Sequence, residues 1–296
     1  KLYRESLENY EVLKSYIDIS TMKKATGKLR EIQEQLLDFA LELTNLFEKE
    51  LQITPIIGFG NLLGAARHKG FIPWDDDIDV VMPREDYEIF LEKAQALLPE
   101  HLFLQHIGTE PEYMMPFAKI RNSNTTFMQK SDMKYNINHG VFIDIIPLDF
   151  CPDSEKEFEK IMATKKRYDF RINSSLDYGT VKNRNTKIKI ALYKLLYPSL
   201  KAVKIKREKL CKSVSETNRF TVYCFLTPWL NTAPVEWFGE GVEVEFEGLK
   251  VIAPKKYHEW NTQLYGDYMQ LPPLSEQVPH HYTGIIDLTK SYKEYI

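Results

Sequence analysis

Apolar side chains recur with a helical period in the first part of the chain. Between residues 29 and 47 they return every three or four positions, with charged residues between them, which predicts amphipathic helix within residues 1–50. A short apolar run, Thr54–Gly58, predicts a strand that glycine ends, and Asn61–His68 predicts a short helix. The chain therefore begins with helices and then passes into strands.

Short apolar runs dominate the following stretch, and one helix, Arg84–Leu98, lies between the first two of them. The predicted strands are Asp77–Met82, Leu102–His106, Phe117–Arg121 and Val141–Pro147. Strands mixed with helices in this order predict an α+β fold, in which a mixed β-sheet core is flanked by helices.

The pattern changes near residue 150. Residues 154–216 are charged and predict helix, Val242–Ile252 alternates and predicts a hairpin, and Pro254–Tyr265 predicts another short helix. We therefore expect two parts: residues 1–150 with the sheet, and residues 151–296 as a further, largely helical and hairpin region.

Composition narrows the class of protein. Hydrophobic residues make up 43% of the chain, enough for a buried core, and the net charge of −3 argues against a nucleic-acid partner. The three cysteines are far apart and form no paired motif, so we expect neither a disulfide framework nor a cysteine zinc site. Without a run of about 18 apolar residues no transmembrane helix is predicted, and the expected location is cytoplasmic.

The stretch from Trp74 to Val80 carries four aspartates. On a strand, positions i and i+2 share a face, so Asp77 and Asp79 are expected to project together. Two adjacent carboxylates repel each other, and a hard cation that binds both removes that cost. Mg²⁺ fits this chemistry, and so does Mn²⁺. The alternative is a solvated acidic turn.

Asp144 stands inside the apolar run from Val141 to Pro147. A charge there is costly unless it is paired or bound to a metal. We expect Asp144 to complete the metal site, to accept a proton from an attacking hydroxyl, or both; the alternative is a buried salt bridge to Lys119 or Arg121. Asp149, which follows Pro147, is interpreted as a turn residue.

A glycine-rich turn, Gly58–Gly64, leads from a strand into a helix. Glycine lets the backbone approach a ligand closely, and helix N-terminal amides favour anions. Cationic residues that could neutralise phosphate oxygens follow the helix or alternate on a later strand, namely Arg67, His68, Lys69, Lys119 and Arg121. The turn matches neither the P-loop nor the full dinucleotide-binding motif.

These features together resemble the nucleotidyltransferase superfamily and, within it, the LicD family, which includes fukutin and the fukutin-related protein. The resemblance rests on the long motif at residues 58–90, which contains WDDDIDVVMP. It extends to residues 117–125, 139–149 and 246–273, and to His281. It implies a nucleotidyltransferase-like catalytic core in the first part and a second part that completes the substrate site.

The resemblance implies that Asp77, Asp79 and Asp144 are both catalytic and metal-binding. The residues expected to contact substrate are Gly60, Asn61, Arg67, His68, Lys69, Trp74, Lys119, Arg121 and His281. It further implies transfer of phosphocholine from CDP-choline to a sugar hydroxyl of a lipid-linked, teichoic acid-type glycan precursor. The alternatives are transfer of ribitol or glycerol phosphate from their CDP-linked donors, and nucleotidyl transfer with release of pyrophosphate.

Choline is a quaternary ammonium, which aromatic side chains bind through cation–π contacts. The aromatic candidates for such a box are Trp74, Tyr113, Trp229, Trp237 and Tyr282. Most aromatic residues of a globular protein serve its core instead.

The segment from Lys182 to Lys212 contains eleven Lys or Arg residues and one acid, Glu208, with apolar residues between them. Such a helix can lie on the anionic inner face of the membrane, where a lipid-linked acceptor is presented. It can equally be a solvated helix with a core-facing stripe.

Overall fold

The computed structural model describes residues 23–175, 183–222, 232–279, 281 and 284–296. Within these residues the main sheet has seven strands; five run in the order β1-β2-β6-β4-β3, while β7 pairs with β6 and β8 with β7. Their bounds are β1 (Ile56–Ile57), β2 (Asp79–Pro83), β3 (Leu102–Gln105), β4 (Ala118–Asn122), β6 (Val141–Phe150), β7 (Arg219–Thr221) and β8 (Ala233–Pro234).

The parallel pair β2 and β6 forms the centre of the sheet. Val80 aligns with Ile145, and the register places Asp79 opposite Asp144. β4 runs antiparallel to β6 on its other side. Every residue of β6 except the last is buried, because helices and loops cover both faces, and this explains its nearly continuous apolar sequence.

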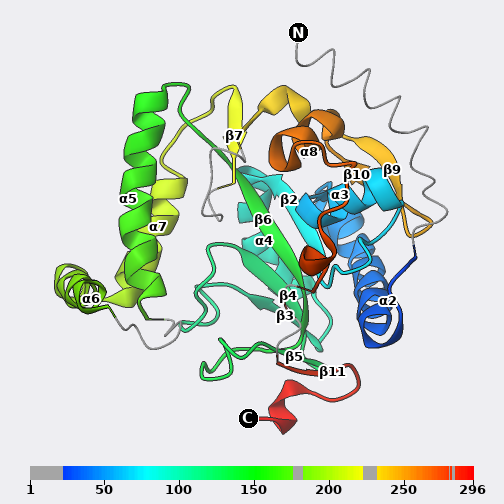
Figure 1. Cartoon of the computed structure of the whole chain (residues 1–296), viewed down its shortest axis with the longest axis horizontal. Coiled ribbons are helices and arrows are strands. Elements are labelled where there is room, and N and C mark those ends of the chain that lie inside the picture. The colour runs from blue at the N-terminus through cyan, green and yellow to red at the C-terminus, as the bar shows by residue number, and fades with distance from the viewer. Residues whose placement is uncertain (1–22, 176–182, 223–231, 280, 282–283) are drawn as a thin grey trace.

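Helices cover this sheet, as Figure 1 shows. Their bounds are α2 (Gly27–Glu42), a π-helical turn (Leu46–Leu51), α3 (Phe59–His68), α4 (Arg84–Leu97), α5 (Glu155–Asn173), α6 (Arg184–Leu196), α7 (Leu200–Cys211) and α8 (Tyr257–Tyr265), with 3₁₀ turns at Val235–Trp237, Leu274–Glu276 and Tyr292–Glu294. α4 packs on β2, β3 and β6, α2 contacts β6, and α5 packs along α7. The predicted α+β class with a mixed, helix-flanked sheet is confirmed.

Two smaller sheets complete the fold. The predicted hairpin is confirmed as β9 (Val242–Phe246) paired with β10 (Leu249–Ala253). Both of its turn residues have positive φ, 53° at Glu247 and 80° at Gly248, as a two-residue type I′ turn requires. The other sheet pairs β5 (Thr126–Met128) with β11 (Ile285–Asp287) and so ties the last described segment to the core.

Several expectations need correction. The strand predicted from Asp77 begins at Asp79. Asp77 therefore lies in the loop before the strand and not in the strand itself. The helical prediction for residues 154–216 is confirmed as three helices, and Pro198 lies in the break between α6 and α7. Asp149 is not a turn residue, since it lies in β6 opposite Thr221.

Other expectations are not decided by the fold. The part of the predicted N-terminal helix in residues 1–22 lies outside the described residues. The division at residue 150 stays a prediction. Among the described helices none combines the length and apolar character needed to cross a membrane.

Candidate active site

Three carboxylates meet at the start of the central strands. One oxygen each of Asp77, Asp79 and Asp144 lies within 4.8 Å of the others. The parallel register of β2 and β6 brings two of them together, and the loop before β2 adds Asp77. The predicted cluster is thus assembled, although Asp77 reaches it from a loop.

Two residues at the beginning of α3 shape that loop. The side chain of Asn61 accepts a hydrogen bond from the Asp79 backbone N–H (2.5 Å) and donates one to the Asp77 carbonyl (3.1 Å). A Cβ at Gly60 would lie 2.8 Å from Oδ2 of Asp75, so only glycine leaves that carboxylate its place. Asn61 thus fixes the backbone of two of the acids, and the role of Gly60 and Asn61 as substrate contacts stays a prediction.

The cluster carries excess negative charge. Burial, followed by the charges of Asp77 and Asp144, raises the pKa of Asp79 well above its usual value. Burial and the charge of Asp77 likewise raise the pKa of Asp75, whose buried Oδ2 has no hydrogen-bond partner among the described residues. Oxygen-only ligands with unbalanced charge fit a hard divalent cation such as Mg²⁺ or Mn²⁺.

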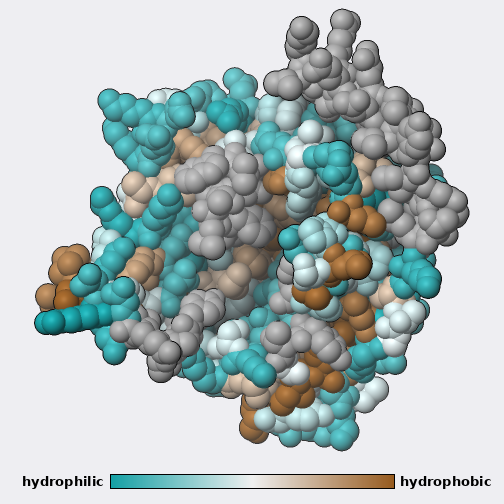
Figure 2. Space-filling model, in the orientation of Figure 1, coloured by the Kyte–Doolittle hydropathy of each residue, from teal (hydrophilic) through white to brown (hydrophobic). Residues whose placement is uncertain are grey.

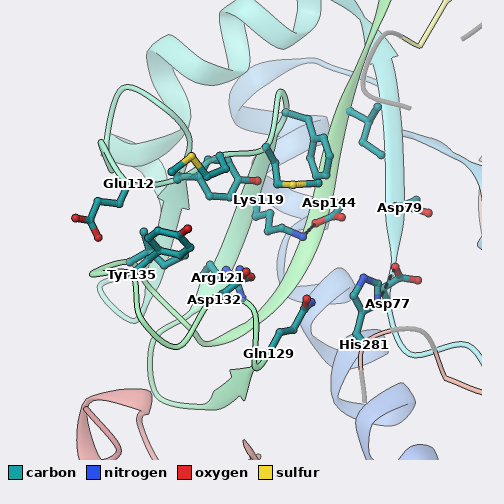
Figure 3. Close-up of a pocket in the computed structure, with 16 residues that line it drawn as sticks. Asp77, Asp79, Glu112, Lys119, Arg121, Gln129, Asp132, Tyr135, Asp144 and His281 are labelled. Atoms are coloured by element: carbon teal, nitrogen blue, oxygen red, sulfur yellow. Dashed lines mark hydrogen bonds and ion pairs between the residues drawn. The ribbon is translucent and has the colours of Figure 1, made fainter. Parts of the chain in front are cut away.

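Lys119 and Arg121 enter the site from β4, as their alternation predicts (Figure 3). Nζ of Lys119 lies 2.5 Å from Oδ1 of Asp144 and 3.5 Å from the centre of the Phe142 ring. Arg121 donates to Oε1 of Gln105 (2.8 Å) and to the Gly140 carbonyl (2.7 Å). The salt bridge considered for Asp144 therefore exists, within the carboxylate cluster rather than instead of it.

His281 reaches the acids from the far end of the chain. Its backbone N–H donates to Oδ2 of Asp76 (3.0 Å), and Nδ1 lies 3.1 Å from Oδ1 of Asp76 and 3.6 Å from Oδ2 of Asp77. Burial works against its charge, but the bond to Asp76 and the charge of Asp77 prevail and raise the pKa of the imidazole. The charged form of His281 is thus favoured beside the acids, and Figure 3 shows its ring next to Asp77.

Two cavities meet at the carboxylates. The first, about 260 Å³, contains Lys119, Arg121 and all three acids of the cluster. The second, about 550 Å³, shares Asp77 and Asp79 and lies between α3 and the segment after α8. Its other lining residues include Gly60, Arg67, Trp74, Asp75, Tyr265, Asp267, Tyr268 and Glu276.

Comparison with known proteins agrees with this arrangement. Residues 52–177 match the family model described as LicD/FKTN/FKRP, nucleotidyltransferase domain. The lipopolysaccharide cholinephosphotransferase LicD of Haemophilus influenzae is 33% identical over 270 residues, which cover 88% of this chain and 97% of that protein. This chain belongs to the LicD family. It is accordingly a transferase, and the predicted resemblance is confirmed.

The remaining cationic candidates of this LicD-family chain differ in placement. Arg67 lines the second cavity, but its guanidinium is held by the carbonyls of Tyr268 (2.7 Å) and Gln270 (3.0 Å). Burial lowers the pKa of His68 to about 4, so this imidazole is neutral. His68 and the exposed Lys69, which lies 3.5 Å from Glu245, line neither cavity. Their role as substrate contacts stays a prediction.

The aromatic residues considered for a choline-binding box also lie in different places. Trp74 lines the second cavity and Tyr113 the first, whereas Trp237 lines neither. Trp229 and Tyr282 lie outside the described residues. Sequence reasoning missed Tyr265 and Tyr268, which border the second cavity from the end of α8 and the loop after it. The available signal was their position inside the family-like segment 246–273, in which Tyr268 belongs to GDYMQLPP.

Proposed function

We propose that this protein transfers phosphocholine from CDP-choline to a hydroxyl group of a glycan precursor. The observation that carries the proposal is the position of Asp77 and Asp79 in the wall between two chemically different cavities. Both cavities contain aromatic rings and acids, but the first adds the cations Lys119 and Arg121, whereas the one basic side chain among the described residues that line the second is Arg67. The name of the Haemophilus relative supports the same reaction.

The second cavity suits a quaternary ammonium. Trp74, Tyr265 and Tyr268 provide π faces, and Asp267 and Glu276 add negative charge. The single basic side chain in its lining, Arg67, already donates to two carbonyls. A trimethylammonium group gains cation–π attraction and charge complementarity there, whereas ribitol and glycerol carry no charge and gain neither.

Asp77, Asp79 and Asp144 are the residues that would hold Mg²⁺ or Mn²⁺. When bound, the cation would supply charge stabilisation at the donor's phosphate oxygens. Asn61 fixes the backbone of the first two acids, and His281 restrains Asp76 and Asp77 from the opposite side. This rigidity would keep the carboxylates oriented when substrate enters.

The proposed reaction is an in-line displacement at phosphorus. The acceptor hydroxyl oxygen forms a bond to the phosphorus that carries choline, while the bond from that phosphorus to the bridging oxygen breaks and CMP leaves. Asp144, held by Lys119, accepts the hydroxyl proton. Lys119 and Arg121, whose charges face the first cavity, stabilise the negative charge on the phosphoryl oxygens.

The proposed function also includes an acceptor, a compartment and a role for the second part of the chain. The acceptor is a lipid-linked precursor of a teichoic acid-type surface glycan, and the reaction takes place in the cytoplasm. Residues 151–296 complete the substrate site, since Tyr265, Tyr268 and His281 all come from that part of the chain.

A donor panel tests the proposal. Calorimetry in the presence of Mg²⁺ compares CDP-choline, CDP-ribitol, CDP-glycerol and CDP on the wild type and on Asp79→Asn, Trp74→Leu and, as a matched control, Trp237→Leu. We expect selective binding of CDP-choline that Asp79→Asn abolishes, that Trp74→Leu weakens about tenfold, and that Trp237→Leu leaves unchanged.

Other results of these experiments would overturn parts of the proposed function. Equal binding of all four compounds would refute choline selection. Release of pyrophosphate instead of CMP during turnover would make the protein a nucleotidyltransferase. Absence of any binding to the folded protein would remove the proposed donor altogether.

A further inference from the structure

Helix α6 exposes its apolar side chains. None of its residues is buried, and Ile188, Leu192 and Leu195 are 58%, 50% and 77% exposed. These positions are spaced by four and three residues and therefore form one stripe, with Leu196 (60% exposed) at its edge. This stripe faces solvent, while Ile190 and Tyr193 on the other side of α6 are half-buried.

Helix α7 is likewise rich in basic and apolar residues, but its apolar side chains lie in a different environment. α7 buries Val203 and Cys211 and packs along α5. α6 is attached by its opposite side, where the ring of Tyr193 lies 4.7 Å from that of Phe170. In Figure 2, hydrophobic side chains gather beside hydrophilic ones at the left edge, where Figure 1 places α6.

Basic residues flank the stripe. At about 100° per residue, Lys187 and Lys194 fall on one side of it and Lys189 on the other. α6 contains no acid, and between residues 183 and 212 the single acidic residue is Glu208. An apolar stripe between two basic borders is the pattern of a helix that lies flat in a lipid interface.

We propose that α6 docks this protein on an anionic lipid bilayer. The stripe enters the boundary between headgroups and acyl chains, and the lysines contact anionic headgroups. Charge complementarity selects this partner. A second copy of the chain would bring like charges together, and a nucleic acid would leave the leucines in water.

A further cavity lies between α7 and the first cavity of the active site. It has a volume of about 360 Å³ and is lined by Lys201, Lys204 and Ile205 of α7. Two further residues of its wall, Met115 and Phe117, also line the first cavity of the active site. An acceptor anchored in the docked bilayer would therefore approach the active site along α7, a consequence that rests on the proposed function; the docking itself does not.

Vesicle co-sedimentation tests the docking with the full chain. Vesicles of phosphatidylcholine, with and without anionic phosphatidylglycerol, are mixed with the wild type and with the Leu192→Ser/Leu195→Ser variant. Leu41→Ser/Leu97→Ser serves as the matched control, because these leucines are 47% and 42% exposed elsewhere on the surface. Thermal melting verifies that all three proteins are folded.

We expect the wild type and the control to bind anionic vesicles, more weakly at high salt, and the α6 variant to lose at least about tenfold in partitioning. CMP release with a soluble acceptor remains equal in all three, so failure of docking and failure of the proposed reaction are separate results. Unchanged binding by the α6 variant, or no binding by the wild type, would overturn the proposal. So would a wild-type dimer, in the absence of lipid binding, that the α6 variant lacks.

Discussion

The two ends of the β2–β6 strand pair both contain buried carboxylates, but they treat them differently. At one end Asp149 forms a two-pronged ion pair with Arg84, at 2.7 and 2.9 Å, and Arg84 also binds Glu208 at 2.8 Å. At the other end Asp79 and Asp144 face each other. We call these the paired end and the acidic end.

The energetic consequence differs as well. At the paired end burial works against both charges. It raises the pKa of Asp149 to about 6 despite the attraction of Arg84. For Arg84, the charge and hydrogen bond of Asp149 together with the charge of Glu208 overcome the burial and raise the pKa of the guanidinium. At the acidic end burial and neighbouring acids both oppose ionisation of Asp79. Buried charges with matched partners thus fit a structural role, whereas the unbalanced cluster fits the cation site that we propose.

The largest effect is expected at the acidic end. Asp79→Asn should reduce CMP release about 1000-fold or more, because a lost carboxylate ligand removes several kcal/mol of charge stabilisation. The melting temperature of the metal-free protein should stay equal or rise. Turnover assays and thermal melting measure both, and the exposed Asp38→Asn serves as the control. Wild-type turnover in Asp79→Asn would refute the assignment of this end.

A substitution at the paired end should lower the stability of the protein rather than its turnover. Arg84→Met leaves Asp149 buried without its partner and should lower the free energy of unfolding by about 3–5 kcal/mol. Urea unfolding measures the loss, and Lys93→Met on the exposed side of α4 is the control. Restoring much of the stability by Arg84→Met/Asp149→Leu would confirm the pairing; a neutral Arg84→Met would contradict it.

A smaller effect is expected where Asn61 supports the acidic end. Asn61→Ala removes two hydrogen bonds to the Asp77 and Asp79 backbone and should lower kcat about tenfold with little change in KM. Steady-state kinetics separate the two constants. A change confined to KM would mean that Asn61 contacts substrate, as its sequence position first suggested.

The smallest effect is a pH dependence. The folded pKa of Asp79 lies above its ordinary value of 3.8, so the metal-free native state takes up a proton before the unfolded chain does. Its free energy of unfolding should therefore rise as the pH is lowered through the raised value, by at most about 1.4 kcal/mol per unit. Urea unfolding at successive pH values down to the ordinary value of 3.8 should show a flatter profile in Asp79→Asn.

The class of fold and the carboxylates of the acidic end could be predicted from the sequence. The ion pair of the paired end could not. Asp77, Asp79 and Asp144 were recognisable because charge inside or beside apolar strands is costly. Asp149 was misread as a turn residue because its partner Arg84 lies 65 positions away, and nothing local indicates such a pairing. Tyr265 and Tyr268 were missed for the same reason, since their contribution depends on how α8 packs beside α3.

The contact between Asp76 and His281 spans 205 positions of the chain, and this separation has a consequence for synthesis. At about 5–20 residues per second, the ribosome makes the acidic loop about 10–40 seconds before the histidine that restrains it. During that interval a nascent chain carries the acidic loop without the contacts of His281 and without the β5–β11 pairing. Until that segment has emerged, the acidic loop therefore lacks the contacts that His281 makes with it in the folded chain.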